Sequence, residues 1–485
     1  VRCTGEHPHL TTMLKTESNG IFRQYVAAVI ASISVIILGT ALGWPSPVLL
    51  RITEKNEPFP MTGEEVSWMV SVLYLGNLVS PLPAGYLMDK IGRKMSFMVL
   101  SVIPLTSWIF IRFATGPSWL YVARFLSGTW SGIVSTVAPM YLAEISEPRI
   151  RGALSTFVQL MTNMGVLSEY IIGPQVSYSM LAYISGSLPI LFIILFSQMP
   201  ESPYWLLMKG KKERAAKSLS WLRGGADVKE EMENMNRSIE EEMMNKGTLK
   251  DLVATKGNRR ALLIVEMLAL LQRMSGVSAL MAYTSTTLPS RGAGSLTPND
   301  CVVVMGCVWV VSVFIATVLV DSLGRKPLLI LSSLGCGFAM FAAGLWFFLD
   351  QTEYVDVSDF YYVPFAAFLV YGLFFCIGLG PIASTVQGEA FPTNIKGLAS
   401  GITSFVLALT SFVMNKVYHT IADEVGMYLN YWIFSGSCIV SLVFCLVYMI
   451  ETKGKTLSEI QDELNMRKRN KKNKQQDSTT TTELA

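Results

Sequence analysis

Two short charged turns contain the residues of this sequence that are best suited to form a chemical site. The first, 85–94, reads Gly-Tyr-Leu-Met-Asp-Lys-Ile-Gly-Arg-Lys, and the second, 320–326, reads Val-Asp-Ser-Leu-Gly-Arg-Lys. Both contain Asp-x-x-Gly-Arg-Lys, and Asp89 and Asp321 are 232 residues apart, about half of the chain. One copy would be typical of any loop between two apolar segments, but two copies indicate an internal duplication. The chemistry that these residues offer is ion pairing and charge-assisted hydrogen bonding.

Further charges repeat with the same half-chain offset. Glu144 precedes Arg151 by seven residues, and Glu389 precedes Lys396 by the same interval. Glu201 follows the sixth apolar segment and Glu451 follows the twelfth. We predict that these charges join helix ends on the cytosolic side into a network that controls an inner gate. The alternative is a set of surface ion pairs, each worth about 0–1 kcal/mol.

The sequence offers little for metal or redox chemistry. It has three histidines and seven cysteines, none of the cysteines in a C-x-x-C pair. We therefore expect no metal, no cofactor and no enzymatic reaction.

The elements that must position these charges are membrane helices. Hydrophobic residues make up 51% of the chain and charged residues 15%, against about 25% charged in a soluble domain. Runs of about twenty apolar residues are long enough to cross a bilayer. The sequence predicts an all-α membrane protein with twelve transmembrane helices, six in each half. The twelve apolar runs are 24–50, 66–88, 95–113, 118–141, 153–173, 178–199, 261–288, 301–320, 327–349, 361–390, 398–421 and 427–450.

The basic residues predict the orientation. Of the 39 Lys and Arg residues, only Arg51, Lys55, Arg112 and Arg291 fall on the opposite side if both termini are cytosolic, and three lie within spans. The domains expected are a cytosolic segment 1–23, a first bundle 24–199, a cytosolic linker 200–260, a second bundle 261–450 and a cytosolic tail 451–485. The linker is expected to form short helices, with a solvated linker as the alternative.

Several motifs together resemble the sugar porter family of the major facilitator superfamily. They are the two charged turns, Arg124, Glu144 to Gly152, Pro200-Glu-Ser-Pro-Tyr-Trp-Leu, Gln272-Arg-Met-Ser-Gly-Val, Gly380-Pro-Ile and Glu451-Thr-Lys-Gly-Lys-Thr-Leu. The segment 39–48 is similar to insect facilitated trehalose and glucose transporters. The resemblance implies two pseudo-symmetric six-helix bundles around a sugar cavity. It also implies rocking between outward and inward states. We expect the gating network to comprise Asp89, Arg93, Arg124, Glu144, Arg151, Glu201, Asp321, Arg325, Glu389, Lys396 and Glu451.

Amide side chains at membrane depth are candidates for binding a solute. Polar groups inside spans mark pathways, and amides both donate to and accept from hydroxyl groups. The candidates are Gln159, Asn163, Gln272 and Gln387; each could instead join helices. The resemblance implies that Gln159 and Gln272 contact sugar, whereas Arg273, Ser278 and Ser384 stand where the family has Gln, Asn and Trp. Trp309, Cys376 and Leu407-Ala408 also depart from the family pattern.

The expected mechanism is facilitated diffusion. Proton-coupled members of the family have a carboxylate in span one, and the run 24–50 contains no Asp or Glu. Glu169 and Glu266 lie near span ends, where an interfacial charge is expected. We expect a plasma-membrane, multi-pass transporter of trehalose or a hexose-like sugar that acts as a monomer in the lipid bilayer without nucleic acid. The alternatives are a sugar sensor that does not transport, and a transporter of a polyol or an organic anion.

Overall fold

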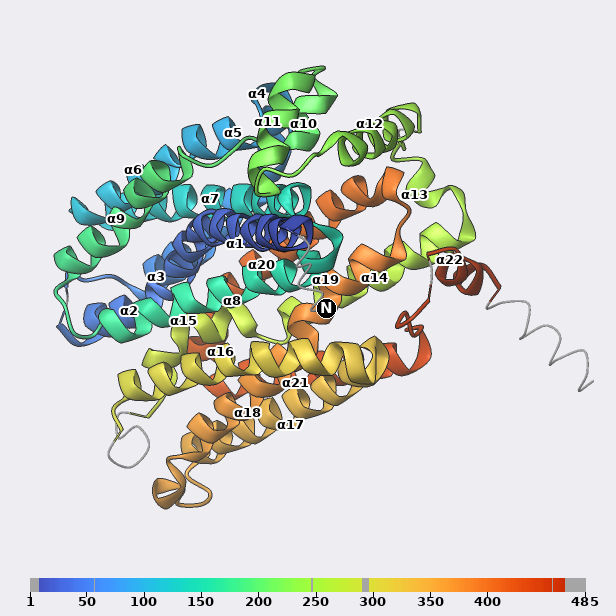
Figure 1. Cartoon of the computed structure of the whole chain (residues 1–485). Helices are drawn as coiled ribbons and strands as arrows, with labels where there is room; N and C mark the ends of the chain where they lie inside the picture. Colours follow the sequence, from blue (N-terminus) through green and yellow to red (C-terminus); the bar gives the residue numbers. More distant parts are fainter. Residues whose placement is uncertain (1–7, 56, 246, 290–295, 456, 467–485) are drawn as a thin grey trace, which may run out of the picture. The chain divides into compact units, whose positions relative to one another are not determined.

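The computed structural model describes residues 8–55, 57–245, 247–289, 296–455 and 457–466 (Figure 1). This part of the chain forms helices and no β-strand, as the composition predicts. The first half contains α1 (Pro8–Gly43), α2 (Pro45–Lys55), α3 (Gly63–Val79), α4 (Pro81–Ile91), α5 (Arg93–Leu100), α6 (Val102–Arg112), α7 (Pro117–Ile145), α8 (Pro148–Ile172) and α9 (Tyr178–Phe196).

The connecting segment and the second half contain the remaining helices. They are α10 (Pro203–Met208), α11 (Lys212–Leu222), α12 (Lys229–Met244), α13 (Asp251–Ala254), α14 (Lys256–Met274), α15 (Val277–Thr287), α16 (Pro298–Leu323), α17 (Arg325–Thr352), the 3-10 helix η1 (Ser358–Phe360), α18 (Val363–Ile377), α19 (Leu379–Ala390), α20 (Thr393–Glu424), α21 (Met427–Val447) and α22 (Leu457–Met466).

Each of the twelve predicted apolar runs coincides with one helix or with two consecutive helices. Among the described residues, nine helical stretches are long and apolar enough to cross a membrane, and the bent pair α3 and α4 is a tenth. The other two runs are α7 and α8, which contain more polar side chains. Polar groups within a bundle tend to face a cavity or another helix, which is consistent with a position of α8 inside the bundle.

Breaks within spans occur at proline and glycine. Span one breaks at Trp44, before Pro45, and span two bends by 42° before Pro81, because proline lacks the N–H that would continue the helix. Span seven breaks between α14 and α15, where Gly276 has φ +94°. Span ten breaks at Gly378, between α18 and α19. By contrast, α7 continues through Pro139.

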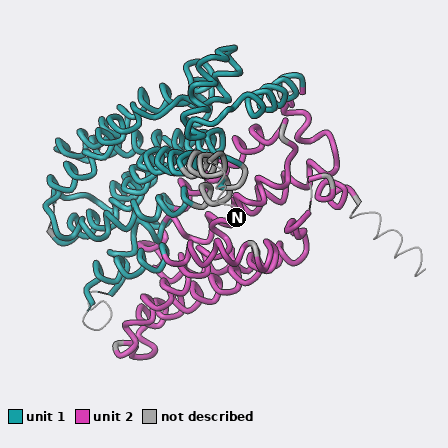
Figure 2. The backbone as a smooth tube through the Cα atoms, in the orientation of Figure 1, with its two compact units in different colours: residues 1–244, 279–310, 415–420 teal, residues 245–278, 311–414, 421–485 magenta. Residues whose placement is uncertain are grey.

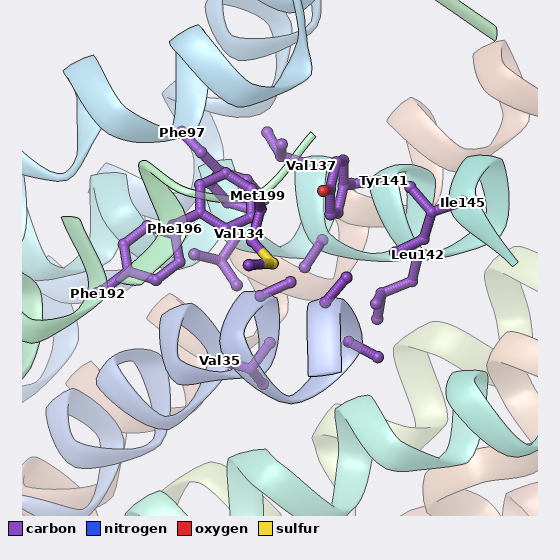
Figure 3. Packing of buried hydrophobic residues seen from close by; sticks show 14 of the residues in the cluster. Val35, Phe97, Val134, Val137, Tyr141, Leu142, Ile145, Phe192, Phe196 and Met199 are labelled. Carbon is purple, nitrogen blue, oxygen red and sulfur yellow. The ribbon is translucent and has the colours of Figure 1, made fainter. Parts of the chain in front are cut away.

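A cluster of buried aromatic and aliphatic residues packs the first half around α1, α5, α7 and α9 (Figure 3). Phe97 lies edge-on to both Phe192 and Phe196, with ring centroids 5.7 and 5.5 Å apart. Tyr141 packs on Phe196 at 5.3 Å, and its hydroxyl donates to the carbonyl of Pro200 at 2.9 Å. These contacts fix the C-terminal part of α7 against the start of the connecting segment.

The chain forms two compact units (Figure 2). Unit 1 comprises 1–244, 279–310 and 415–420, and unit 2 comprises 245–278, 311–414 and 421–485. Unit 1 therefore includes α10–α12, most of α15, the first part of α16 and a short piece of α20. The compact units thus differ from the simple division into sequence halves that the apolar runs suggest.

The connecting segment is helical, as predicted, and α10–α12 pack within unit 1. Trp205 and its neighbours form a small apolar cluster with Ala215 and Ile239. Arg223 at the end of α11 pairs with Glu231 at 2.5 Å and Glu147 at 3.4 Å. The fully buried amide of Gln24 donates to Glu147 at 2.7 Å and to the carbonyl of Leu222 at 3.3 Å, and the second bond ties the linker to the start of span one.

Candidate functional site

The first charged turn forms an ion-pair clamp inside unit 1. Arg93 begins α5 and is 3% exposed. Its Nε donates to both carboxylate oxygens of Glu144 at 3.1 and 3.0 Å, and its Nη2 donates to Glu144 at 2.8 Å. Asp89 is a weaker and more exposed partner at 3.3 Å. The clamp therefore joins the start of span three to the end of span four.

Glu201 caps the N-terminus of α5 in the same cluster. Its carboxylate accepts the backbone N–H groups of Arg93 at 2.9 Å and Lys94 at 3.0 Å. A carboxylate at a helix N-terminus satisfies free N–H groups and complements the helix dipole. Gly92 has φ +101°, and a Cβ there would lie 2.3 Å from a carboxylate oxygen of Glu201. The glycine is required by both the turn and this close approach.

The second charged turn repeats this construction in unit 2. Arg325 begins α17 and donates to Glu389 at 2.8 Å. Glu451 accepts the backbone N–H groups of Arg325 and Lys326, each at 3.0 Å. Gly324 has φ +90° and corresponds to Gly92 in the first turn. A Cβ at Gly324 would lie 2.8 Å from a carboxylate oxygen of Glu451. The duplication read from the sequence is therefore also a duplication of hydrogen bonds.

The two clamps differ in burial and in accessory contacts. The side chains of Arg93 and Glu144 are 4% and 10% exposed, against 13% and 28% for Arg325 and Glu389. Thr452 donates to the second oxygen of Glu389 at 2.6 Å, a contact that motif spacing did not predict. Lys396 is exposed. The side chains of Arg151 and Asp321 lie outside the described residues.

All of these contacts join residues of one unit. The structure thus brings together Asp89, Arg93, Glu144 and Glu201 in unit 1, and Arg325, Glu389 and Glu451 in unit 2. The control of an inner gate by these charges remains a prediction.

Arg124 lies apart from the clamps, within unit 1. It is 2% exposed on α7 and donates to the carbonyls of Ala41 and, at 3.4 Å, Met69. Its guanidinium also lies 5.6 Å from the ring centroid of Trp44, at the break in span one. Arg124 therefore satisfies backbone carbonyls at this break and contacts an aromatic face.

The amides of α8 lie one helical turn apart. Gln159 is exposed and donates to Asn163 at 3.3 Å. Asn163 is 2% exposed, and its Nδ2 has no hydrogen-bond partner. Because this contact lies within one helix, it leaves both amides with capacity for a hydroxyl-rich solute.

Gln272 uses its donor group on the backbone. Its amide nitrogen donates to the carbonyls of Leu379 and Gly380 at 2.9 and 2.8 Å, next to the break between α18 and α19. The side chain therefore joins spans seven and ten through hydrogen bonds of its amide nitrogen. Its amide oxygen is the atom that could accept a hydrogen bond from a solute. Spacing could not reveal this role, because the carbonyls become available only where span ten breaks.

The remaining candidates in unit 2 have separate surroundings. Arg273 is half-buried in the last turn of α14, where the negative end of the helix dipole favours a cation. Ser278 is 1% exposed and its hydroxyl has no hydrogen-bond partner, although α15 itself continues in unit 1 from Ala279. Ser384 donates to the carbonyl of Pro381 at 2.8 Å, and Gln387 donates to Ser400 at 2.7 Å.

A further set of contacts within unit 1, which the sequence did not predict, joins residues of the first half, of segment 279–310 and of segment 415–420. Lys416 lies 3.9 Å from Glu64 and 4.6 Å from the ring centroid of Trp68. Tyr283 stacks on Tyr418 with ring centroids 4.8 Å apart. The only sequence signal was the presence of a lysine within an apolar run.

The expectation that Glu169 is an interfacial charge is wrong. Its side chain is 1% exposed, and Ser185 of α9 donates to it at 2.5 Å. Position near the end of a run does not predict exposure, because α9 and the break after α1 cover this part of α8. Glu266 is only partly buried and accepts from Thr403 at 2.7 Å.

The chain is similar to a known protein family and to curated sequences. A family described as "Sugar (and other) transporter" matches residues 25–464. The Facilitated trehalose transporter Tret1 of Drosophila mojavensis is 33% identical over 445 residues, which cover 91% of this chain and 51% of that protein. The protein with the same name in Culex quinquefasciatus is 32% identical over 91% of this chain and 85% of its own length. The chain thus spans about half the length of several curated relatives that it matches.

Solved structures share the fold. The inward open conformation of the xylose transporter XylE from E. coli is 21% identical in sequence, with a TM-score of 0.75. The match covers 90% of this chain and 99% of that chain. At this identity the likeness establishes the fold alone, which is that of the major facilitator superfamily.

Proposed function

The chain belongs to the family of sugar (and other) transporters, and from this premise we propose that it is a facilitative transporter that moves a sugar across a membrane by alternating access. In such a cycle no bond of the solute is made or broken. The solute gradient sets the direction of net flow, and the exchange between outward-facing and inward-facing states sets the rate.

The duplicated clamp is the observation that carries this proposal. In each half, an Arg at the start of the third span pairs with a Glu at the end of the fourth span. A second Glu, which follows the last helix of the half, accepts the N–H groups at the same helix start. Three helix ends are thereby tied together in each half, which supports movement of each half as a body.

The proposed solute is trehalose or a hexose-like sugar. Support comes from relatives named as facilitated trehalose transporters and from the adjacent amides Gln159 and Asn163 on α8. An anionic solute is the second candidate, because Arg273 is half-buried at the break of span seven and an Arg offers donors but no acceptor. We further propose a plasma-membrane location, cytosolic termini and a monomeric transporter.

Uptake into proteoliposomes that contain the purified full chain tests this function. The panel is trehalose, glucose, a polyol and an organic acid, with protein-free liposomes as the control. Saturable uptake of trehalose or glucose that stops at equal concentrations on both sides is expected. Saturable binding of a sugar without flux would refute transport and favour a sensor, and selective uptake of the organic acid would favour the second candidate.

A further inference from the structure

Glu169 is a carboxyl group buried within unit 1. It lies on α8 and is 1% exposed. One oxygen accepts a hydrogen bond from Ser185 at 2.5 Å, and the other, Oε2, is buried without a hydrogen-bond partner. The backbone of α1 is close, since a Cβ built on Gly43 would lie 3.2 Å from the Cβ of Glu169.

The charged groups on the surrounding helices are engaged elsewhere. Arg51 of α2 donates to the carbonyl of Gly173 at 2.7 Å and to that of Val176, beyond the end of α8. Arg124 of α7 donates to the carbonyl of Ala41 and faces Trp44. Within the described residues, no cation forms an ion pair with Glu169.

The hydroxyl groups nearby are also accounted for. Tyr170 donates to the carbonyl of Met281 at 2.9 Å, and Tyr178 of α9 donates to the carbonyl of Ile111 at 2.9 Å. Neither tyrosine donates to Glu169. Among the described residues, Ser185 is the hydroxyl group that donates to this carboxyl group.

An ionised carboxylate with one neutral donor is strongly disfavoured in such a place. Burial of a charge without a counter-ion costs several kcal/mol or more, and the group avoids this cost by binding a proton. The same logic applies at membrane depth, where isolated acids are rare and functional. We propose that Glu169 is a proton-binding site: it is a neutral carboxylic acid in the arrangement seen here and releases its proton to water when the site is hydrated.

Within unit 1, α15 lies against α2 and the first part of α16 lies against α8. Gly306 packs against Leu167 and Tyr170, and Ser285 donates to the carbonyl of Ser46 at 2.5 Å. If segment 279–310 separates from α8 during the proposed transport cycle, outside water reaches the break after α1. Glu169 then loses its proton to that water at alkaline pH, and the resulting carboxylate resists re-burial. This consequence rests on the proposed function, whereas proton binding itself does not.

Infrared spectroscopy of the purified full chain in liposomes tests the proton site without any solute. At neutral pH exposed Asp and Glu are ionised, because their pKa values are about 4, so a protonated-carboxyl stretch reports buried acids. We expect such a band in the wild type, its weakening in Glu169→Gln and no change in the control Glu213→Gln, which removes an exposed acid of α11. Identical spectra of the wild type and Glu169→Gln in this region would overturn the proposal.

A second variant, Ser185→Ala, tests the same site without changing Glu169, so the test does not depend on whether Glu169→Gln folds. Ser185 donates to the carboxyl group and so favours its ionised form; Ser185→Ala should therefore move the loss of the band upward by about one pH unit. A band whose titration is unchanged by Ser185→Ala would refute the assignment of this band to Glu169.

Sugar uptake at stepped external pH tests the consequence for transport. Wild-type uptake should fall as external pH rises, by up to about tenfold per pH unit once most Glu169 is ionised at the exposed stage. Glu169→Gln, which stays neutral, should show no such fall. A wild-type pH profile in Glu169→Gln would overturn this coupling. If no variant takes up sugar, the proposed function fails, and the infrared result still decides the proton site.

Discussion

Replacement of Arg93 by Ala should destabilise the protein more than the equivalent change in the second half. In Arg93→Ala, Glu144 keeps a side chain that is only 10% exposed and loses the partner that donates three hydrogen bonds to it. Loss of one partner of a buried ion pair costs about 3–5 kcal/mol, because the other charge stays buried and unpaired. Glu389 is 28% exposed and keeps its bond from Thr452, so Arg325→Ala should cost only about 1 kcal/mol.

The double variant Arg93→Ala/Glu144→Ala separates pairing from burial. It removes both charges, so it should recover a large part of the stability that Arg93→Ala loses. The assay is unfolding in mixed detergent micelles, followed by tryptophan fluorescence, for the wild type, both single Arg variants and the double variant. An Arg325→Ala variant as unstable as Arg93→Ala, or a double variant no more stable than Arg93→Ala, would refute this reasoning.

Cysteine accessibility from each side should also show a shift of Arg93→Ala toward the inward-facing state, and unchanged accessibility would count against a gating role.

Three further predictions concern the proposed solute site and the second clamp. Gln159→Ala should lower sugar affinity about two- to tenfold at normal surface expression, which corresponds to one neutral hydrogen bond of about 0.5–1.5 kcal/mol; unaltered affinity in binding and uptake assays would exclude solute contact. Arg273→Gln should shift solute preference toward ordinary hexoses in the uptake panel, since an amide both donates and accepts; a misfolded variant with unchanged selectivity in the surviving fraction would favour a structural role. Burial raises the pKa of Glu451, but the backbone N–H groups of Lys453, Arg325, Lys326 and Thr452 outweigh this effect and lower its pKa. The stability that ionised Glu451 contributes is therefore present above about pH 4.3, and it is lost as the pH falls through the lower pKa of the folded state. The difference in stability between the wild type and Glu451→Gln should therefore narrow below about pH 4.3. A difference that is constant with pH would contradict this.

The sequence by itself determined the helices and the two clamps in outline. Apolar length predicts spans because a bilayer requires about twenty residues, and each of the twelve runs corresponds to helix in the structure. The charged turns were recognisable because their geometry is local: glycine at positive φ permits the turn, and the next residues begin a helix that needs a cap. Repetition across half the chain added evidence that one copy would not provide.

The tertiary structure alone decided which partner each polar side chain takes. Arg93 bonds mainly to Glu144 rather than to Asp89, four residues away, because α7 brings Glu144 against the buried start of α5. Gln272 bonds to carbonyls exposed by a break in another span, and Glu169 is buried by α9 and by the break after α1. Periodicity shows which residues share a face of a helix, but the neighbour that covers that face is chosen by long-range packing. Long-range packing therefore determines whether a polar side chain is exposed, forms hydrogen bonds between helices or is buried.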